Sequence, residues 1–330
     1  MMEHLPFIFL CLMALSMLIY VLLDGYDLGV GMLMAWADDD QRDSMIASIG
    51  PFWDANETWL VLGVGILLVA FPVAHGVILQ ALYLPVALML IGLILRGVAF
   101  DFRVKARAHH QANWNRAFVA GSLSAAVAQG VMLGRFITGF GDGWQYWTFA
   151  LFIGICLAAG YCLLGAGWLI MKTTDELQKK AVHWARRSLL VTALGVAGVS
   201  AATPLVSDRI SERWFASPQW IFLAPVPLLT LCLFIYCYVM TRKLPLAGDR
   251  RCWVPFVCGV GIFVLAFIGL TYSLYPYLVV DQITYLAAAS APESLLIILV
   301  GTGFTLPAIA AYTVYAYRVF WGKSTKLSYD

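Results

Sequence analysis

Charged side chains are scarce in this sequence of 330 residues. Asp, Glu, Lys and Arg make up 12% of the chain and hydrophobic residues make up 62%, whereas ordinary soluble domains carry about 25% charged residues. A surface of this composition would not be stable in water. The sequence therefore excludes a soluble protein and predicts a chain embedded in a membrane.

Motifs that would indicate several other functions are also missing. The net charge is only +2 and there is no basic block, so nucleic acid is not expected as a partner. The seven cysteines form no C-x-x-C pair, and we interpret them as small core residues. The histidines lie in loops or at span edges rather than facing inward as metal or haem ligands would, so no metal site is predicted. They are His4, His75, His109, His110 and His183.

Long apolar runs predict the fold class, which is an all-α polytopic membrane protein. A helix needs about 20 apolar residues to cross a bilayer, and nine such runs are separated by short polar stretches. The predicted spans are 6–36, 51–71, 76–100, 116–138, 147–171, 184–204, 219–241, 253–276 and 293–320. No other segment is long enough for a further domain, so 1–330 is predicted to be a single integral membrane domain.

Basic residues are distributed unevenly between the two ends of these spans. Of the 21 lysines and arginines, all but four fall in alternate loops and in the C-terminal tail. The four exceptions are Arg209 and Arg213 in the opposite loops and Arg96 and Arg135 within spans. Loops rich in Lys and Arg face the cytoplasm. We therefore predict that the N-terminus is outside and the C-terminus inside.

A weak internal repeat connects the first and fifth predicted spans. Leu28, Gly29, Gly31 and Met34 resemble Leu164, Gly165, Gly167 and Ile170. A repeat that steps over four spans predicts two parallel four-helix units with one span left over. The first unit would cover 1–138 and the second unit with the extra helix 147–330. Chance is the alternative, because glycines at such spacings are common in packed membrane helices.

Ionisable residues collect at one depth near the predicted cytoplasmic end of the first three spans. The set is Asp24, Asp27, Asp54, Glu57, Arg96, Asp101 and Arg103. The two acidic pairs are each spaced i, i+3, so each pair shares a helical face. An unpaired carboxylate near a helix centre costs about 3 kcal/mol. We expect pairing with Arg96 and Arg103, protonation, or water access; for Asp101 and Arg103 a capping role at the interface is favoured.

Three ordered motifs within the first 103 residues carry a resemblance to a known family. They are Leu23-Asp24-Gly25-Tyr26-Asp27-Leu28-Gly29-Val30-Gly31, Gly50-Pro51-Phe52-Trp53-Asp54-Ala55-Asn56-Glu57-Thr58-Trp59 and Arg96-Gly97-Val98-Ala99-Phe100-Asp101-Phe102-Arg103. The chain resembles subunit II of the cytochrome bd ubiquinol oxidases, including the cyanide-insensitive type. The resemblance implies nine helices in two four-helix units plus one peripheral helix.

The resemblance also implies a function in a bacterial respiratory chain. The chain would be the haem-free, non-catalytic partner of a subunit I in the cytoplasmic membrane. That subunit would hold two b-type haems and a haem d or third b-type haem, oxidise quinol near the outer face and reduce oxygen with cytoplasmic protons. Small single-span subunits, lipid and quinone are further expected partners.

Roles for individual residues follow from the resemblance. The Asp54 position belongs to a cytoplasmic proton path at the subunit contact, and we expect Glu57, Asp24, Asp27 and Asp101 to line it, with Arg96 and Arg103 as charge partners. Trp53 and Trp59 are expected at an oxygen route or at the subunit contact. Glu57 stands where some relatives have glutamine, which adds a titratable group and leaves open whether Asp54 or Glu57 dominates. Ala55 stands where many have glycine.

Two other functions are compatible with the sequence. A proton-coupled secondary transporter also uses carboxylates within the membrane, but it would usually show broken helices near the midplane in both halves. Here the acidic residues are confined to the first half, which favours a path that feeds a partner. A purely structural scaffold subunit is the third interpretation, and in that case the carboxylates would be dispensable.

Overall fold

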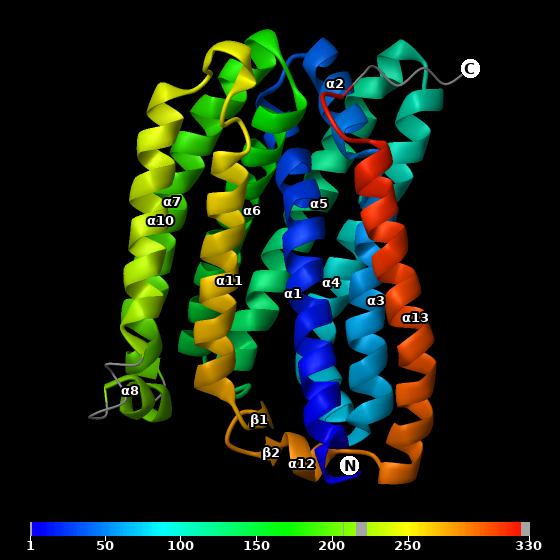
Figure 1. The fold of residues 1–330 in the computed structure, drawn as a ribbon, viewed down its shortest axis with the longest axis vertical. Coiled ribbons are helices and arrows are strands. Elements are labelled where there is room, and N and C mark those ends of the chain that lie inside the picture. Colours follow the sequence, from blue (N-terminus) through cyan, green and yellow to red (C-terminus); the bar gives the residue numbers. More distant parts are fainter. Residues whose placement is uncertain (1, 207, 216–222, 325–330) are drawn as a thin grey trace.

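The described part of the chain consists mainly of long helices that run side by side (Figure 1). The computed structural model describes residues 2–206, 208–215 and 223–324. The long helices are α1 (Leu5–Leu33), α3 (Trp53–Ala70), α4 (Pro72–Lys105), α5 (Ala108–Ile137), α6 (Trp144–Lys172), α7 (Asp175–Val206), α10 (Pro225–Lys243), α11 (Val254–Leu274) and α13 (Pro292–Val319). The short elements are η1 (Met2–His4), η2 (Met34–Trp36), α2 (Asp39–Ile49), α8 (Asp208–Phe215), η3 (Ala247–Asp249), β1 (Tyr277–Val279), β2 (Ile283–Thr284) and α12 (Tyr285–Ala288).

The prediction of an all-α polytopic membrane protein is confirmed. Among the described residues, 8 helices are long and apolar enough to cross a membrane, namely α1, α3, α4, α5, α6, α10, α11 and α13. The predicted span 184–204 lies within α7, a helix of 32 residues that packs against α6 and α10. Residues 219–222 of the predicted span 219–241 lie outside the described residues. The count of nine spans therefore stays a prediction.

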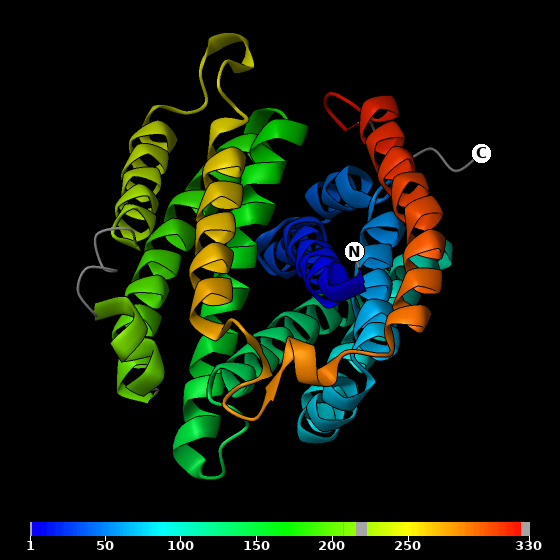
Figure 2. The same ribbon diagram turned by 60° about the horizontal axis from the view of Figure 1, so that its bottom comes forward.

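The helices pack in two groups that meet where α6 contacts α1 and α5 (Figure 2). One group contains α1, α3, α4 and α5, the other contains α6, α7, α10 and α11, and α13 lies at the edge beside α3. A Cβ on Gly29 would lie 1.8 Å from the carbonyl oxygen of Tyr161, and one on Gly165 would lie 2.4 Å from the nitrogen of Val30. Small residues permit this close approach. The two segments of the internal repeat thus pack against each other.

Helix ends differ from the predicted span ends in the polar stretches. α4 continues to Lys105 and α5 begins at Ala108, whereas the predicted spans end at 100 and begin at 116. Hydropathy identifies the apolar part of a helix and not its polar extension into water. The sequence did not predict α2, α12 or the antiparallel pair β1–β2, because these elements are short and lie in connections. In that pair Tyr277 is opposite Thr284, and Val279 is opposite Ile283.

The interpretation of all seven cysteines as core residues is wrong for two of them. Cys11 and Cys232 are exposed on the helix surface, whereas Cys237 and Cys258 are buried. The other three are partly buried. A free cysteine behaves as a small hydrophobe and is therefore compatible with a lipid-facing position. An apolar run alone does not show which of its faces is buried.

The two ends of the bundle carry different connections. The start of α1 and the end of α13 lie at opposite ends (Figure 1). The connections α4–α5, α6–α7 and α10–α11 lie at the end that holds α2, whereas α8, α12 and the β1–β2 pair lie at the other end. The loops rich in Lys and Arg therefore share one end of the molecule.

We expect the end that holds α2 to face the cytoplasm, because positive charge collects there. Single cysteines at Lys105, Lys179 and Arg250, in a cysteine-free background, should resist an impermeant thiol reagent added to intact cells. Gln282→Cys, in the exposed turn between β1 and β2, is the control and should be labelled. Labelling of the first three positions from outside would contradict the orientation.

Candidate functional site

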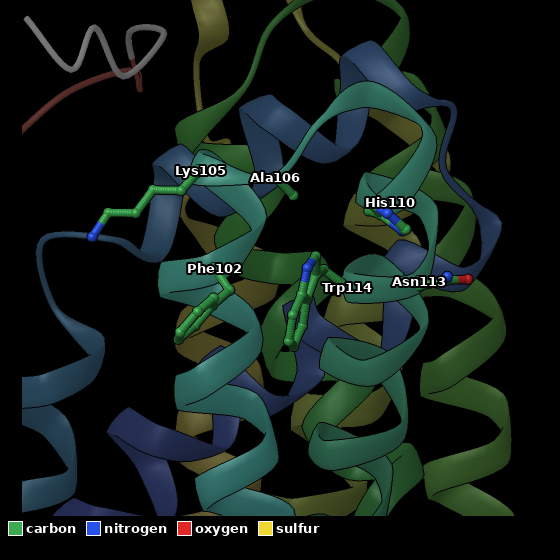
Figure 3. A pocket seen from close by; sticks show the side chains of 6 residues that line it. All are labelled: Phe102, Lys105, Ala106, His110, Asn113 and Trp114. Atoms are coloured by element: carbon green, nitrogen blue, oxygen red, sulfur yellow. The ribbon is translucent and has the colours of Figure 1, made fainter.

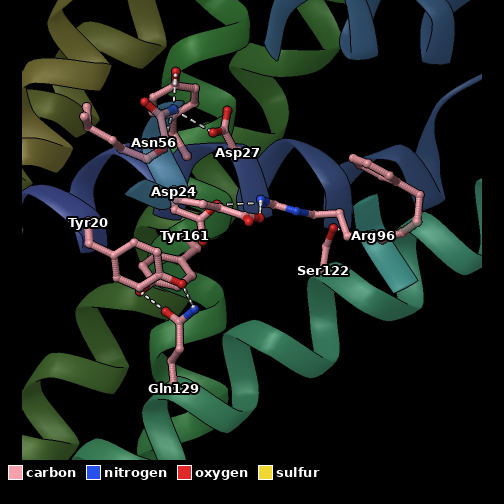
Figure 4. A network of polar contacts seen from close by, with 12 residues as sticks. Tyr20, Asp24, Asp27, Asn56, Arg96, Ser122, Gln129 and Tyr161 are labelled. Carbon is pink, nitrogen blue, oxygen red and sulfur yellow. Dashed lines mark hydrogen bonds and ion pairs between the residues drawn. The ribbon is translucent and has the colours of Figure 1, made fainter. Parts of the chain in front are cut away.

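A guanidinium and two carboxylates form ion pairs inside the bundle (Figure 4). Arg96 of α4 lies 2.8 Å from Asp24 of α1 and also pairs with Glu57 of α3. The Arg96 and Asp24 side chains are each 1% exposed, whereas Glu57 is 27% exposed. The fold thus brings together residues from three helices that the sequence placed at one depth.

Asp27 lies about one turn further along α1 and is fully buried. Its Oδ2 accepts a 2.7 Å hydrogen bond from Asn56 Nδ2, and its Oδ1 has no hydrogen-bond partner among the described residues. Asn56 also donates to the Tyr26 hydroxyl at 3.1 Å and accepts from the Tyr317 hydroxyl at 3.2 Å. Sequence reasoning missed Asn56, Tyr26 and Tyr317, because neutral polar residues were not part of the charge pattern.

The ion cluster, defined as Asp24, Asp27, Glu57 and Arg96, holds three carboxylates and one guanidinium. If all four groups were ionised, two negative charges would lack a positive partner inside a membrane-spanning bundle. Charges in that environment cost free energy unless they are paired or neutralised. The ion cluster therefore holds more carboxylates than its one guanidinium can pair.

Asp54 and Asp101 lie outside the buried part of this arrangement. Asp54 precedes Glu57 by about one turn of α3, and its side chain is exposed. The exposed fraction of the side chain thus decreases from Asp54 through Glu57 to Asp24. These three residues form a series from the surface of this chain into the ion cluster. Asp101 is also exposed, and no ion pair joins it to the ion cluster in the described residues.

Arg103 does not pair with the carboxylates expected for it. Its Nη2 pairs with Asp43 of α2, and its Nε donates a 2.5 Å hydrogen bond to Asn115 of α5. Arg103 follows Arg96 by two turns of α4, which places it about 10 Å further along the helix. At that level it meets α2, a helix that hydropathy did not predict. Arg103 therefore ties three helices together at the end of the bundle.

The two tryptophans have different surroundings. Trp53 lies against the ion cluster, with the Arg96 guanidinium carbon 5.7 Å from its ring centre, and such a contact stabilises a cation. Trp59 is 4% exposed, and its Nε1 has no hydrogen-bond partner among the described residues. Burial within this chain favours the expected oxygen route for Trp59 over a direct subunit contact, and both stay predictions.

A second polar group lies about one turn of α1 before Asp24 (Figure 4). Gln129 of α5 donates to the Tyr20 hydroxyl and accepts from the Tyr161 hydroxyl, both at 2.7 Å. All three side chains are buried. Sequence reasoning missed this group, although a glutamine inside the apolar run 116–138 was a usable signal. The group fixes the contact of α5 with α1 and α6.

A cavity of about 340 Å³ opens between the end of α4 and the start of α5 (Figure 3). Its lining residues are Phe102, Lys105, Ala106, His110, Asn113 and Trp114. The rings of Phe102 and Trp114 stack with their centres 5.4 Å apart. None of the residues singled out in the sequence as site residues lines this cavity, so it is separate from the ion cluster.

The four histidine side chains that the structure describes lie at or near the surface of the chain. His4, His110 and His183 are exposed and His75 is partly buried near the start of α4, while the His109 side chain lies outside the described residues. Axial haem ligands project into a pocket, and these four positions do not fit that role. No group of three or more His, Cys, Asp or Glu among the described residues could hold a metal ion.

Ion pairs tie the polar connections at the end that holds α2. Lys180 lies 2.7 Å from Asp38, and Lys323 lies 3.1 Å from Asp249. The hydrogen bond from Lys180 lowers the pKa of Asp38. The pKa of Asp249 is lowered chiefly by a 2.6 Å hydrogen bond from Gln178. Both carboxylates therefore stay ionised near neutral pH. The ion pairs that they form weaken only when the pH falls into the acid range.

The fold and the ion cluster define a polytopic helical membrane protein with a charge network inside its first helices. The model of the family described as "Cytochrome bd terminal oxidase subunit II" matches residues 5–320. The chain belongs to this family and is one subunit of an oxidoreductase complex that contains haem and a subunit I. The resemblance found in the sequence is thereby confirmed.

Individual relatives agree with this assignment. The chain is 26% identical over 321 residues to cytochrome bd ubiquinol oxidase subunit 2 of Bacillus subtilis, with 91% of each chain covered. It is 31% identical over 216 residues to cytochrome bd-I ubiquinol oxidase subunit 2 of Escherichia coli, a match that covers 60% of this chain and 57% of that protein. The solved bd oxidase of Geobacillus thermodenitrificans has a similar fold, with a TM-score of 0.75, 16% identity and coverage of 96% and 98%.

Proposed function

We propose that this chain is the haem-free subunit II of a quinol:oxygen oxidoreductase, and that it conducts cytoplasmic protons toward the oxygen-reduction site of its partner. The observation that carries the proposal is the series from exposed Asp54 through Glu57 to the buried Arg96–Asp24 pair. This series begins at the surface of the chain and ends among carboxylates that can exchange protons. Asp27, about one turn of α1 from Asp24, adds a further buried carboxylate.

The proposal extends to the partners and the location of the complex. Subunit I would hold two b-type haems with a haem d or a third b-type haem, and quinol would be the electron donor. The relatives in Bacillus subtilis and Escherichia coli are ubiquinol oxidase subunits, which supports quinol as the substrate class. The complex would lie in the bacterial cytoplasmic membrane with the end that holds α2 facing the cytoplasm, together with lipid and small accessory subunits.

We also propose that the chain is built from two four-helix units and one extra helix. The packing of α1, α3, α4 and α5 supports a first unit over 1–138, which holds the ion cluster. The packing of α6, α7, α10 and α11 supports a second unit within 147–330, with α13 as the extra helix. Membership of an oxidase family favours the function of an oxidase subunit over that of a secondary transporter, because a transporter would work without a haem-bearing partner.

The haem-free role predicts an optical result. Purified from cells that lack its partner, the chain should show no Soret band, because its described histidines do not fit axial ligation. Co-expressed with the haem-bearing subunit, it should purify in a complex that shows one. A stoichiometric Soret band from the chain alone that His75→Ala abolishes would contradict the haem-free assignment.

Proton conduction is tested by neutralising the series in the assembled complex. Asp54→Asn and Glu57→Gln keep the shapes of the side chains and remove their titration. Slowed oxygen reduction at normal haem content is expected if the series carries protons. Full turnover with both residues neutralised would contradict proton conduction through Asp54 and Glu57 and would favour a structural scaffold role for this part of the chain.

A further inference from the structure

One residue of the last helix, α13 (Pro292–Val319), is hydrogen-bonded to neighbours of the ion cluster. Of its described residues, Leu295, Thr302 and Ala316 are buried, so most of the helix surface faces outward. Tyr317 near its end is half-buried and makes two side-chain hydrogen bonds to other helices, α1 and α3. Tyr317 therefore links the peripheral helix to the interior of the first group.

Contacts with two aromatic side chains hold the ring of Tyr317 in place. It stacks on Phe52 with ring centres 4.5 Å apart and meets Trp168 edge-on at 6.1 Å. The Lys172 ammonium lies 5.4 Å from the Phe52 ring centre and 5.0 Å from that of Trp168, and its Nζ donates a hydrogen bond to the backbone oxygen of Phe320. These contacts fix the ring independently of its hydroxyl. The hydroxyl is thus presented to the interior at a set position.

The hydroxyl completes a closed ring of three hydrogen bonds. Tyr317 donates to Asn56 Oδ1 at 3.2 Å, Asn56 Nδ2 donates to the Tyr26 hydroxyl at 3.1 Å, and the two tyrosine hydroxyls lie 2.6 Å apart. With Tyr317 donating to the amide, the Tyr26 hydroxyl is left to donate to Tyr317. The second N–H of the same amide donates to Asp27 Oδ2 at 2.7 Å.

The Asp27 carboxylate, which only accepts hydrogen bonds, sets which way the Asn56 amide faces. A flipped amide would turn its oxygen toward the Asp27 carboxylate and its NH₂ toward Tyr317. That arrangement would lose the hydrogen bond to Asp27 and place two acceptor oxygens together. In the orientation in which Nδ2 faces Asp27, the amide oxygen needs a donor, and the Tyr317 hydroxyl supplies it and so holds the amide in place.

We propose that Tyr317 is a positioning residue for proton transfer, acting on Asp27 through the Asn56 amide. With Oδ2 occupied by Asn56, the other oxygen, Oδ1, is the one free to take up or release a proton, since it has no hydrogen-bond partner among the described residues. The charged groups that face Asp27 are Asp24 of α1, Glu57 of α3 and Arg96 of α4. This inference depends on the proposed proton path, and it makes α13 part of that path.

The test uses Tyr317→Phe in the complete oxidase complex. Phenylalanine keeps the stack on Phe52 and removes the hydroxyl, so the complex should assemble with normal haem content. The maximal turnover rate, kcat, should fall about three- to tenfold, as expected for the loss of one hydrogen bond. The KM for quinol should not change, because the change lies in the proton path. The control is Tyr315→Phe, in which a 66% exposed tyrosine of the same helix loses its hydroxyl, and it should keep wild-type kcat.

A double-mutant cycle separates positioning from a purely structural role. In the Asn56→Ala background, Tyr317→Phe should cause no further loss of kcat, because the amide through which it acts is gone. An additive loss would show that Tyr317 acts by another route and would overturn the proposal. Wild-type kcat in Tyr317→Phe, alongside slow turnover in the combined Asp54→Asn and Glu57→Gln variant, would overturn the role of Tyr317 and leave the proton path standing. Wild-type kcat both in Tyr317→Phe and in the combined variant would overturn both proposals.

Discussion

Oxygen reduction by the assembled complex should slow by at least about tenfold when Asp54→Asn and Glu57→Gln are combined, because positioned proton-transfer groups contribute this much or more. The two carboxylates lie about one turn apart on α3, and Glu57 pairs directly with Arg96. Haem content should be normal, since neither side chain belongs to the core of the bundle. The loss should deepen as the pH rises, because protons become scarce on the cytoplasmic side.

The single variants show which carboxylate dominates. Asp54 is exposed in this chain, whereas Glu57 connects the surface to the buried pair. Asp40→Asn is the matched control, because Asp40 of α2 is also exposed near the same end of the bundle and was not assigned to the path. A loss in Asp40→Asn as large as in the combined variant would place the path elsewhere on this surface.

Removing the charge partner should have the largest effect on assembly. Arg96→Met leaves Asp24, which is 1% exposed, without a cation, and breaking a buried ion pair in this way costs about 3–5 kcal/mol. We expect little assembled complex and a clearly lower melting temperature for what does assemble. The measurement is the yield and thermal unfolding of the purified complex.

A surface ion pair gives the comparison for this variant. Lys179 pairs with Glu176, but these side chains are 61% and 73% exposed, so Lys179→Met should leave the melting temperature close to that of the wild type. Adding Asp24→Asn to Arg96→Met should restore part of the lost stability, because it removes the unpaired carboxylate. Equal melting temperatures for Arg96→Met and Lys179→Met would contradict the account of a buried, mutually dependent ion cluster.

The sequence predicted the fold class and the approximate positions of the spans, because hydropathy depends on local composition. It also predicted that Asp24, Glu57 and Arg96 lie at one depth, since span order and direction determine depth. Family membership was accessible from three motifs in the first 103 residues. These features depend on the spacing of residues along the chain, which the amino-acid sequence gives directly.

Features that depend on how helices pack were not accessible. The pairing of Arg103 with Asp43 needed the position of α2, and the role of Tyr317 needed α13 to lie beside α3. The exposed position of Cys11 depended on which face of α1 is buried. Neutral polar side chains such as Gln129 carry no charge pattern, so their hydrogen-bond partners appear only in three dimensions.

Proton uptake is the measurement that tests the central claim most directly. The complex is reconstituted in vesicles with its α2 end accessible, and proton uptake from that side is followed with a pH-sensitive dye after an oxygen pulse to the reduced enzyme. The account predicts that uptake slows together with oxygen reduction in the combined Asp54→Asn and Glu57→Gln variant, at unchanged haem content. Uptake at the wild-type rate in that variant would contradict the account.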